Sequence, residues 1–128
     1  MTSKRTPQRK HRAHSAAVPL SVLRGIKLFA TDVDGVLTDS GMYYSESGDE
    51  WKKFNTRDGM GIKLLQRAGI ITAIVTQERT KLVARRAEKL AIPELHQGVM
   101  DKLTVIREMA ARHGLSLKQV AYIGDDVN

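Results

Sequence analysis

The chain has 128 residues, a net charge of +7 and no cysteine. This length suits one domain with a core and is too short for two. The lack of cysteine excludes disulfides, thiolate nucleophiles and sulfur-ligated metal sites. No apolar run approaches the roughly 20 residues of a membrane-spanning helix, and no signal-peptide pattern precedes the first predicted strand, so we expect a cytoplasmic protein without a membrane partner.

The positive charge is concentrated at the N-terminus. Residues 1–24 contain six of the 21 basic residues and none of the 14 acidic ones, which leaves residues 25–128 nearly neutral. The first segment has few large apolar side chains to offset the entropy of ordering, so we expect residues 1–24 to form a disordered basic tail. It lacks aromatic residues for base stacking, and we therefore do not expect nucleic acid as a partner. Residues 25–128 are expected to form one α/β domain.

Apolar runs alternate with amphipathic segments along this domain. The predicted strands cover residues 26–31, 70–75, 94–96 and 120–123, and the predicted helices cover residues 58–68, 80–90 and 101–113. Between the first strand and the first helix, residues 35–55 predict a β-hairpin flap that carries Tyr43, Tyr44 and Trp51. The alternation predicts an α/β fold with a three-layer, Rossmann-like parallel sheet and right-handed crossovers.

Apolar residues within the helices predict which face of each helix packs on the sheet. They are Met60, Ile62, Leu64 and Leu65 in the first helix, and Leu103, Val105, Ile106 and Met109 in the third. The chain stops just past its last predicted strand, without a helix to cover that part of the sheet. We therefore expect a domain that lacks its C-terminal part or borrows cover from elsewhere.

Polar residues follow the predicted strands where the strands end. They are Asp32 and Asp34 after the first strand, Thr76 after the second, Lys102 at the helix after the third, and Asp125 after the fourth. The carboxyl ends of parallel strands meet at one edge of a sheet, so we expect these side chains to converge. Three acids close together repel unless a cation lies among them, and oxygen donors suit Mg²⁺. A hydroxyl and an ammonium can hold phosphate oxygens, so the pattern predicts metal-assisted phosphoryl transfer.

The same motifs resemble those of a known family. DVDGV, the strand ending in Thr76, the isolated Lys102 and IGDDVN are similar to the four motifs of the haloacid dehalogenase superfamily of phosphohydrolases, in their usual order. The likeness covers residues 26–128. The segments TDVDGVLTD, FNTRDGMGIKLL, RRAEKL, QGVMDKL and AYIGDDVN further resemble the capless branch of 3-deoxy-D-manno-octulosonate 8-phosphate phosphatases, with a truncated C-terminus.

The resemblance implies a role for each strand-end residue. Asp32 would be the nucleophile that forms an aspartyl-phosphate, and Asp34 would be the general acid and then the general base. Thr76 and Lys102 would stabilise the transferring phosphoryl group. Mg²⁺ would be held by Asp32, the main-chain carbonyl of Asp34, and Asp125. As a structural alternative, the acids could cap strand ends and Lys102 could be a solvated helix residue.

The resemblance also implies a substrate and an assembly. The substrate would be a phosphorylated 3-deoxy-2-ulosonic sugar acid, with 3-deoxy-D-manno-octulosonate 8-phosphate as the first choice. The residues expected to contact it are Asp34, Asn55, Thr56, Arg57, Asp58, Gly59, Lys63, Glu78, Arg86 and Lys102. Relatives of this branch form homotetramers in which the flap of one subunit closes over a neighbouring site. The flap aromatic residues fit this use.

One departure from the branch leaves the substrate open. The octulosonate phosphatases usually follow the motif threonine with Gly-Arg, whereas this chain has Gln77 and Glu78. Glu78 resembles the nononate-type relatives, which act on 9-phosphates of neuraminic or deaminated neuraminic acid, and an anion near a substrate carboxylate changes preference. Two other classes of protein share parts of this pattern: a non-catalytic phosphatase-like assembly domain, as attached to some neuraminate cytidylyltransferases, and a phosphorylation-switch receiver domain. DVDGV and the hairpin argue against the receiver domain.

Overall fold

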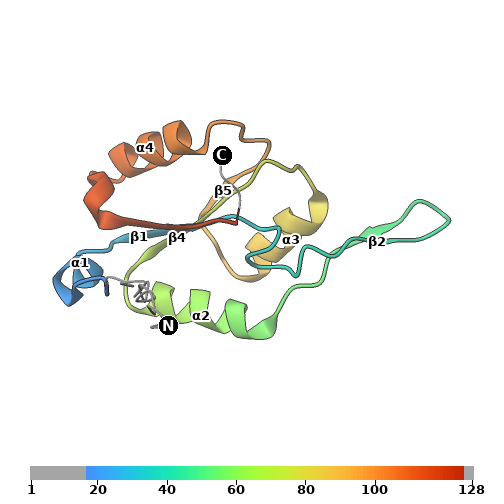
Figure 1. Cartoon of the computed structure of the whole chain (residues 1–128), viewed down its shortest axis with the longest axis horizontal. Coiled ribbons are helices and arrows are strands. Elements are labelled where there is room, and N and C mark those ends of the chain that lie inside the picture. The colour runs from blue at the N-terminus through green and yellow to red at the C-terminus, as the bar shows by residue number, and fades with distance from the viewer. Residues whose placement is uncertain (1–16, 126–128) are drawn as a thin grey trace, which may run out of the picture.

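A four-stranded parallel sheet forms the centre of the computed structural model, which describes residues 17–125 (Figure 1). The strand order is β5-β4-β1-β6, and every neighbouring pair is parallel. The strands are β1 Leu28–Thr31, β4 Ile71–Val75, β5 Glu94–His96 and β6 Val120–Ile123. The predicted α/β class with a parallel sheet is therefore confirmed, and β5 and β6 cover the predicted residues.

Helices cover both faces of the sheet and make three layers (Figure 1). They are α2 Thr56–Arg67 and α3 Lys81–Lys89 on one face and α4 Lys102–Arg112 on the other. Strand β4 shows why helices are needed on both faces of the sheet, because its side chains alternate between the two faces. Ile74 packs in a cluster with residues of α2 and α3, whereas Val75 packs in a cluster with Met109 of α4.

Each of the three long helices begins at a side-chain cap. Asn55 accepts a hydrogen bond from the Arg57 amide at 2.8 Å, Thr80 accepts one from the Val83 amide at 3.2 Å, and Asp101 accepts one from the Thr104 amide at 3.1 Å. Such caps satisfy amides that have no partner within the helix. The cap at Asn55 also explains why α2 starts two residues earlier than predicted.

The predicted hairpin is present and projects away from the sheet (Figure 1). Its strands are β2 Tyr43–Tyr44 and β3 Glu50–Trp51, and an isolated bridge between Thr38 and Phe54 closes its base. Tyr43, Tyr44 and Trp51 are all exposed. Whether the hairpin acts as a flap remains a prediction.

The structure differs from the predicted tail at its last residues. Leu20–Arg24 form the short helix α1, with exposed side chains, where a disordered segment was expected. Residues 1–16 of the tail and residues 126–128 of the predicted domain lie outside the described residues. A 3-10 turn, Leu117–Gln119, also precedes β6. Within residues 17–125, no helix is both long enough and apolar enough to cross a membrane.

Two helices bury only part of the apolar stripe predicted for them. Met60 and Leu64 of α2 are 57% and 55% exposed, since α2 is buried mainly through Gly59 and Ile62. In α4, Leu103 is 52% exposed, and the residues that pack inward are Lys102, Ile106, Met109 and Ala110. Of the predicted stripe, Ile106 and Met109 are buried as expected, whereas Leu103 is exposed and Lys102, which contacts a carboxylate at the end of β1, is buried.

Candidate active site

A buried ion pair lies at the carboxyl end of β1. Asp32 follows the strand and is 5% exposed, and Lys102, at the start of α4, is 3% exposed. The Lys102 ammonium lies 2.8 Å from Asp32 Oδ2, while Asp32 Oδ1 accepts a hydrogen bond of 2.7 Å from the Val33 amide. Both carboxylate oxygens are therefore held, and residues 70 positions apart in the chain meet as predicted.

The environment of Lys102 keeps its side chain charged. Burial lowers the pKa of this lysine, but the hydrogen bond and charge of Asp32 outweigh burial, so the pKa is raised above its ordinary value. Tyr122 of β6 acts in the same direction as Asp32. The site thus holds a permanent positive charge beside the carboxylate of Asp32.

A cavity of about 610 Å³ opens at the same sheet edge. Its lining residues are Asp32, Asp34, Ser40, Thr76, Gln77, Glu78 and Asp125. Thr76 is buried, and its backbone is fixed on both sides by hydrogen bonds to His96 and Val99 of 2.9 and 3.0 Å. The structure therefore brings five predicted site residues to one cavity, and Lys102 joins them through Asp32. Their chemical roles remain predictions.

The turn after Asp34 requires glycine. Gly35 has a φ of +76°, in the left-handed region that favours glycine. A Cβ atom at this position would lie only 1.7 Å from Asp125 Oδ2 and 2.8 Å from Ser40 Oγ. Asp125, which follows β6, consequently packs directly against the turn that follows the first strand.

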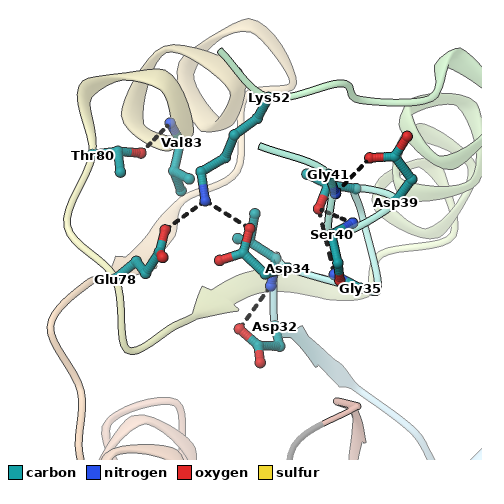
Figure 2. A network of polar contacts seen from close by, with 12 residues as sticks. Asp32, Asp34, Gly35, Asp39, Ser40, Gly41, Lys52, Glu78, Thr80 and Val83 are labelled. Atoms are coloured by element: carbon teal, nitrogen blue, oxygen red, sulfur yellow. Dashed lines mark hydrogen bonds and ion pairs between the residues drawn. The ribbon is translucent and has the colours of Figure 1, made fainter. Parts of the chain in front are cut away.

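Lys52 of the hairpin reaches the site, which the sequence did not predict (Figure 2). Its ammonium lies 2.6 Å from Asp34 Oδ1 and 2.5 Å from Glu78 Oε2, and its side chain is fully buried. Burial lowers the pKa of Lys52, but hydrogen bonds to the two carboxylates raise it further than burial lowers it. One feature of the sequence could have indicated this position. Lys52 directly follows Trp51, and because successive side chains of a strand point to opposite faces, Lys52 points away from the face of Trp51.

The predicted substrate residues 55–59 and Lys63 are not among those that line the 610 Å³ cavity, which we call the carboxylate cavity. Asn55–Gly59 form the cap and first turn of α2, and Lys63 lies about one turn further along. Arg57 and Asp58 line a second cavity of about 670 Å³, which shares Asp125 with the first. Glu78, by contrast, lines the first cavity directly.

Arg86 makes its contacts within the chain. Its guanidinium donates a hydrogen bond of 3.2 Å to the Asn55 carbonyl and lies 5.4 Å from the centre of the Phe54 ring. A Cβ atom on Gly59 would come within 2.8 Å of the same guanidinium. Arg86 therefore packs against the start of α2, and a direct substrate contact is not needed to explain its position.

The donor groups at the first cavity suit a hard cation. Asp32, Asp34 and Asp125 offer carboxylate and carbonyl oxygens, which Mg²⁺ prefers. In residues 17–125, no three acidic, histidine or cysteine side chains are grouped closely enough to hold a metal ion by themselves. Mg²⁺ usually keeps several waters and needs only one or two protein carboxylates, so this donor set fits it.

Comparison with known proteins identifies the relatives of the chain, although no protein-family model matches it. A 3-deoxy-D-manno-octulosonate 8-phosphate phosphatase from Yersinia pestis is 46% identical over 102 residues, which are 80% of this chain and 54% of that protein. The crystal structure of such a phosphatase from Moraxella catarrhalis, in complex with magnesium, phosphate and the KDO molecule, superposes with a TM-score of 0.81 at 43% identity. The match covers 84% of this chain and 62% of the Moraxella catarrhalis chain.

A third relative extends the comparison to the superfamily. A structure from Legionella pneumophila, assigned to subfamily III A of the haloacid dehalogenase superfamily, has a TM-score of 0.81 at 40% identity and covers 84% of this chain and 59% of its own. The chain thus spans between about one half and two thirds of the relatives that it matches. It is homologous, over that span, to the 3-deoxy-D-manno-octulosonate 8-phosphate phosphatases of the haloacid dehalogenase superfamily.

Proposed function

We propose that the chain is part of a magnesium-dependent phosphatase that acts on a phosphorylated 3-deoxy-2-ulosonic sugar acid, with 3-deoxy-D-manno-octulosonate 8-phosphate as the preferred substrate. The observation that carries this proposal is the position of Asp32, which lies at the wall of the cavity with Lys102 at 2.8 Å. The bound magnesium, phosphate and KDO of the Moraxella catarrhalis relative support it. A cytoplasmic location is part of the same proposal.

The residues divide the reaction between them in two steps. A carboxylate oxygen of Asp32 attacks phosphorus, the bond from phosphorus to the sugar oxygen breaks, and Asp34 donates a proton to the leaving oxygen. Water then attacks the aspartyl-phosphate, passes its proton to Asp34, and releases phosphate and the free Asp32. Asp32, the carbonyl of Asp34 and Asp125 would hold Mg²⁺, which supplies positive charge to the phosphoryl oxygens.

Two groups stabilise the phosphoryl group during transfer. Lys102 contributes a fixed ammonium beside Asp32, and Thr76 contributes a hydroxyl from the buried end of β4. Asp32 holds the Lys102 ammonium, and backbone hydrogen bonds fix Thr76, before substrate arrives. Little reorganisation is then needed when charge develops on the transferring group.

The charge around Glu78 is the feature that is relevant to the choice between the two candidate substrates. Glu78 lines the carboxylate cavity, which favours the nine-carbon alternative, because an anion there opposes a carboxylate held at close range. Lys52 lies on Glu78 and offsets this charge, which favours the eight-carbon acid. We keep the eight-carbon acid first and the nine-carbon 9-phosphates as the alternative.

A homotetramer is the assembly we propose. The hairpin aromatic residues are exposed, and the predicted substrate residues of α2 line a neighbouring cavity more than the carboxylate cavity. A second subunit whose hairpin packs near the site would bury the aromatic residues. Sedimentation velocity of the protein and of Trp51→Ser tests the proposal. A wild-type protein that stays monomeric at micromolar concentration would contradict it.

Phosphate release tests the activity. The intact protein is incubated with the eight-carbon 8-phosphate and the nine-carbon 9-phosphate, with magnesium and with EDTA, beside Asp32→Asn. We expect turnover with magnesium only, faster on the eight-carbon substrate, and at least a thousandfold loss in Asp32→Asn. Full turnover by a folded Asp32→Asn variant would exclude the nucleophile role. A wild-type protein that hydrolyses neither substrate would favour the assembly-domain alternative.

A further inference from the structure

The hairpin delivers one buried cation to the site. Lys52 directly follows β3, whose Trp51 is 52% exposed, yet the Lys52 side chain has no exposed surface. Lysine is almost never fully buried without a partner, because its ammonium loses hydration. The ammonium here contacts two carboxylates, Asp34 and Glu78, which come from the loops after β1 and β4 (Figure 2).

The geometry makes the three side chains interdependent. Asp34 and Glu78 line the same cavity, so without a cation between them their negative charges would repel. The hydrogen bond from Lys52 to one oxygen of Asp34 restricts the rotation of that carboxylate. Because Lys52 belongs to the hairpin, the position of the hairpin and the orientation of Asp34 are coupled.

We propose that Lys52 is a positioning residue for the phosphatase reaction: it orients Asp34 for proton transfer and neutralises Glu78 so that an anionic substrate can enter the cavity. This inference rests on the proposed function and adds a residue to it. A purely structural role, in which Lys52 only fastens the hairpin, would change stability but leave turnover in the folded protein intact.

The chain offers a matched control at the next position. Lys53 is exposed and has the same side chain on the same arm of the hairpin, and it lines a different hollow, beside Thr38 and Asp39. Lys53→Met therefore removes one positive charge and one hydrophilic side chain from the hairpin without touching Asp34. A difference between the two methionine variants measures what the position of Lys52 contributes.

Steady-state kinetics on the eight-carbon 8-phosphate test the first half of the proposal. We expect Lys52→Met to lower kcat by ten- to a hundredfold, because a general acid is worth about 10² to 10⁴ and is misplaced rather than removed. Lys52→Arg keeps the charge and should recover part of kcat, and Lys53→Met should stay within twofold of wild type. A wild-type kcat in folded Lys52→Met would overturn the positioning role.

A second comparison isolates the effect on Glu78. In Lys52→Met, Glu78 is left without its cation, so KM should rise, and adding Glu78→Gln should lower KM again without restoring kcat. Equal KM values in the single and double variants would overturn the neutralising role.

Two further readouts separate the possible failures. Hydrogen exchange of residues 43–51 should be faster in Lys52→Met than in Lys53→Met, and equal rates would contradict the coupling. A wild-type protein that releases no phosphate refutes the proposed function itself, whereas an active wild type with an unaffected Lys52→Met refutes only the inference.

Discussion

Removing the Lys102 ammonium is the sharpest test of the buried site. At 2.8 Å and an effective dielectric constant of about 20, Coulomb's law gives roughly 6 kcal/mol of attraction to Asp32, much of which is offset by the desolvation of both ions. Lys102→Met leaves the carboxylate buried and unpaired, and the loss of one partner of a buried pair typically costs about 3–5 kcal/mol. We expect Lys102→Met to lower the free energy of unfolding by this amount.

Urea unfolding in EDTA measures the effect, followed by a double-mutant cycle. Asp32→Asn removes the unpaired charge, so the variant that combines it with Lys102→Met should recover part of the lost stability, with a coupling energy above about 1 kcal/mol. Arg107→Met, an exposed cation on the same helix, is the control and should change stability by less than about 0.5 kcal/mol. A Lys102→Met protein as stable as wild type, or a coupling near zero, would refute the reasoning.

Two further predictions concern the Gly35 turn and an ion cluster at β5. Gly35→Ala should displace Asp125 and lower both stability and phosphate release. Gly48→Ala, also at positive φ but in open space, should lower stability alone. Equal phosphate release by the two variants would contradict this prediction. A hydrogen bond from Arg112 lowers the pKa of Glu94 to about 2, although burial of the carboxylate acts to raise it. Because the pKa of Glu94 in the folded protein lies below the ordinary 4.5, ionised Glu94 stabilises the fold by about 2–3 kcal/mol above pH 4.5. This stabilisation is lost as the pH falls toward 2. In urea unfolding, the gap between wild type and Glu94→Gln should shrink from pH 7 to pH 3, and a constant gap would exclude the mechanism.

The sheet was predictable because each strand is a short apolar run, and the inner strands β1 and β4 are buried on both faces. Continuous apolar runs locate them, and β5 and β6 cover the predicted residues. Helix faces were less predictable, because Leu103 is apolar yet exposed, while its charged neighbour Lys102 faces the core. The burial of Lys102 depends on Asp32, 70 residues away, so the apolar pattern of the helix does not show it and only the order of the motifs predicted it. The helix at Leu20–Arg24 was missed because it lies in a stretch whose basic composition indicated disorder.

The residues at the strand ends were predictable for a topological reason. Parallel strands place all their carboxyl ends at one edge, so Asp32, Thr76 and Asp125 converge because their strands are neighbours in one parallel sheet. Lys52 follows no such rule, since the direction of the hairpin relative to the sheet is set by tertiary contacts. The side chain that links Asp34 and Glu78 therefore had to come from the structure.

The balance of charge at the site explains how its parts depend on one another. Counted with every carboxylate ionised, Asp32, Asp34, Glu78 and Asp125 place four negative charges around one cavity, and Lys52 and Lys102 supply two positive charges. A phosphate ester that approached this wall would meet a net negative charge of about two and be repelled. One divalent cation cancels that excess, so the proposed requirement for magnesium follows from the protein charges as well as from the chemistry of phosphoryl transfer. The two lysines are thus insufficient by themselves, and either one removed would deepen the imbalance that the cation has to offset.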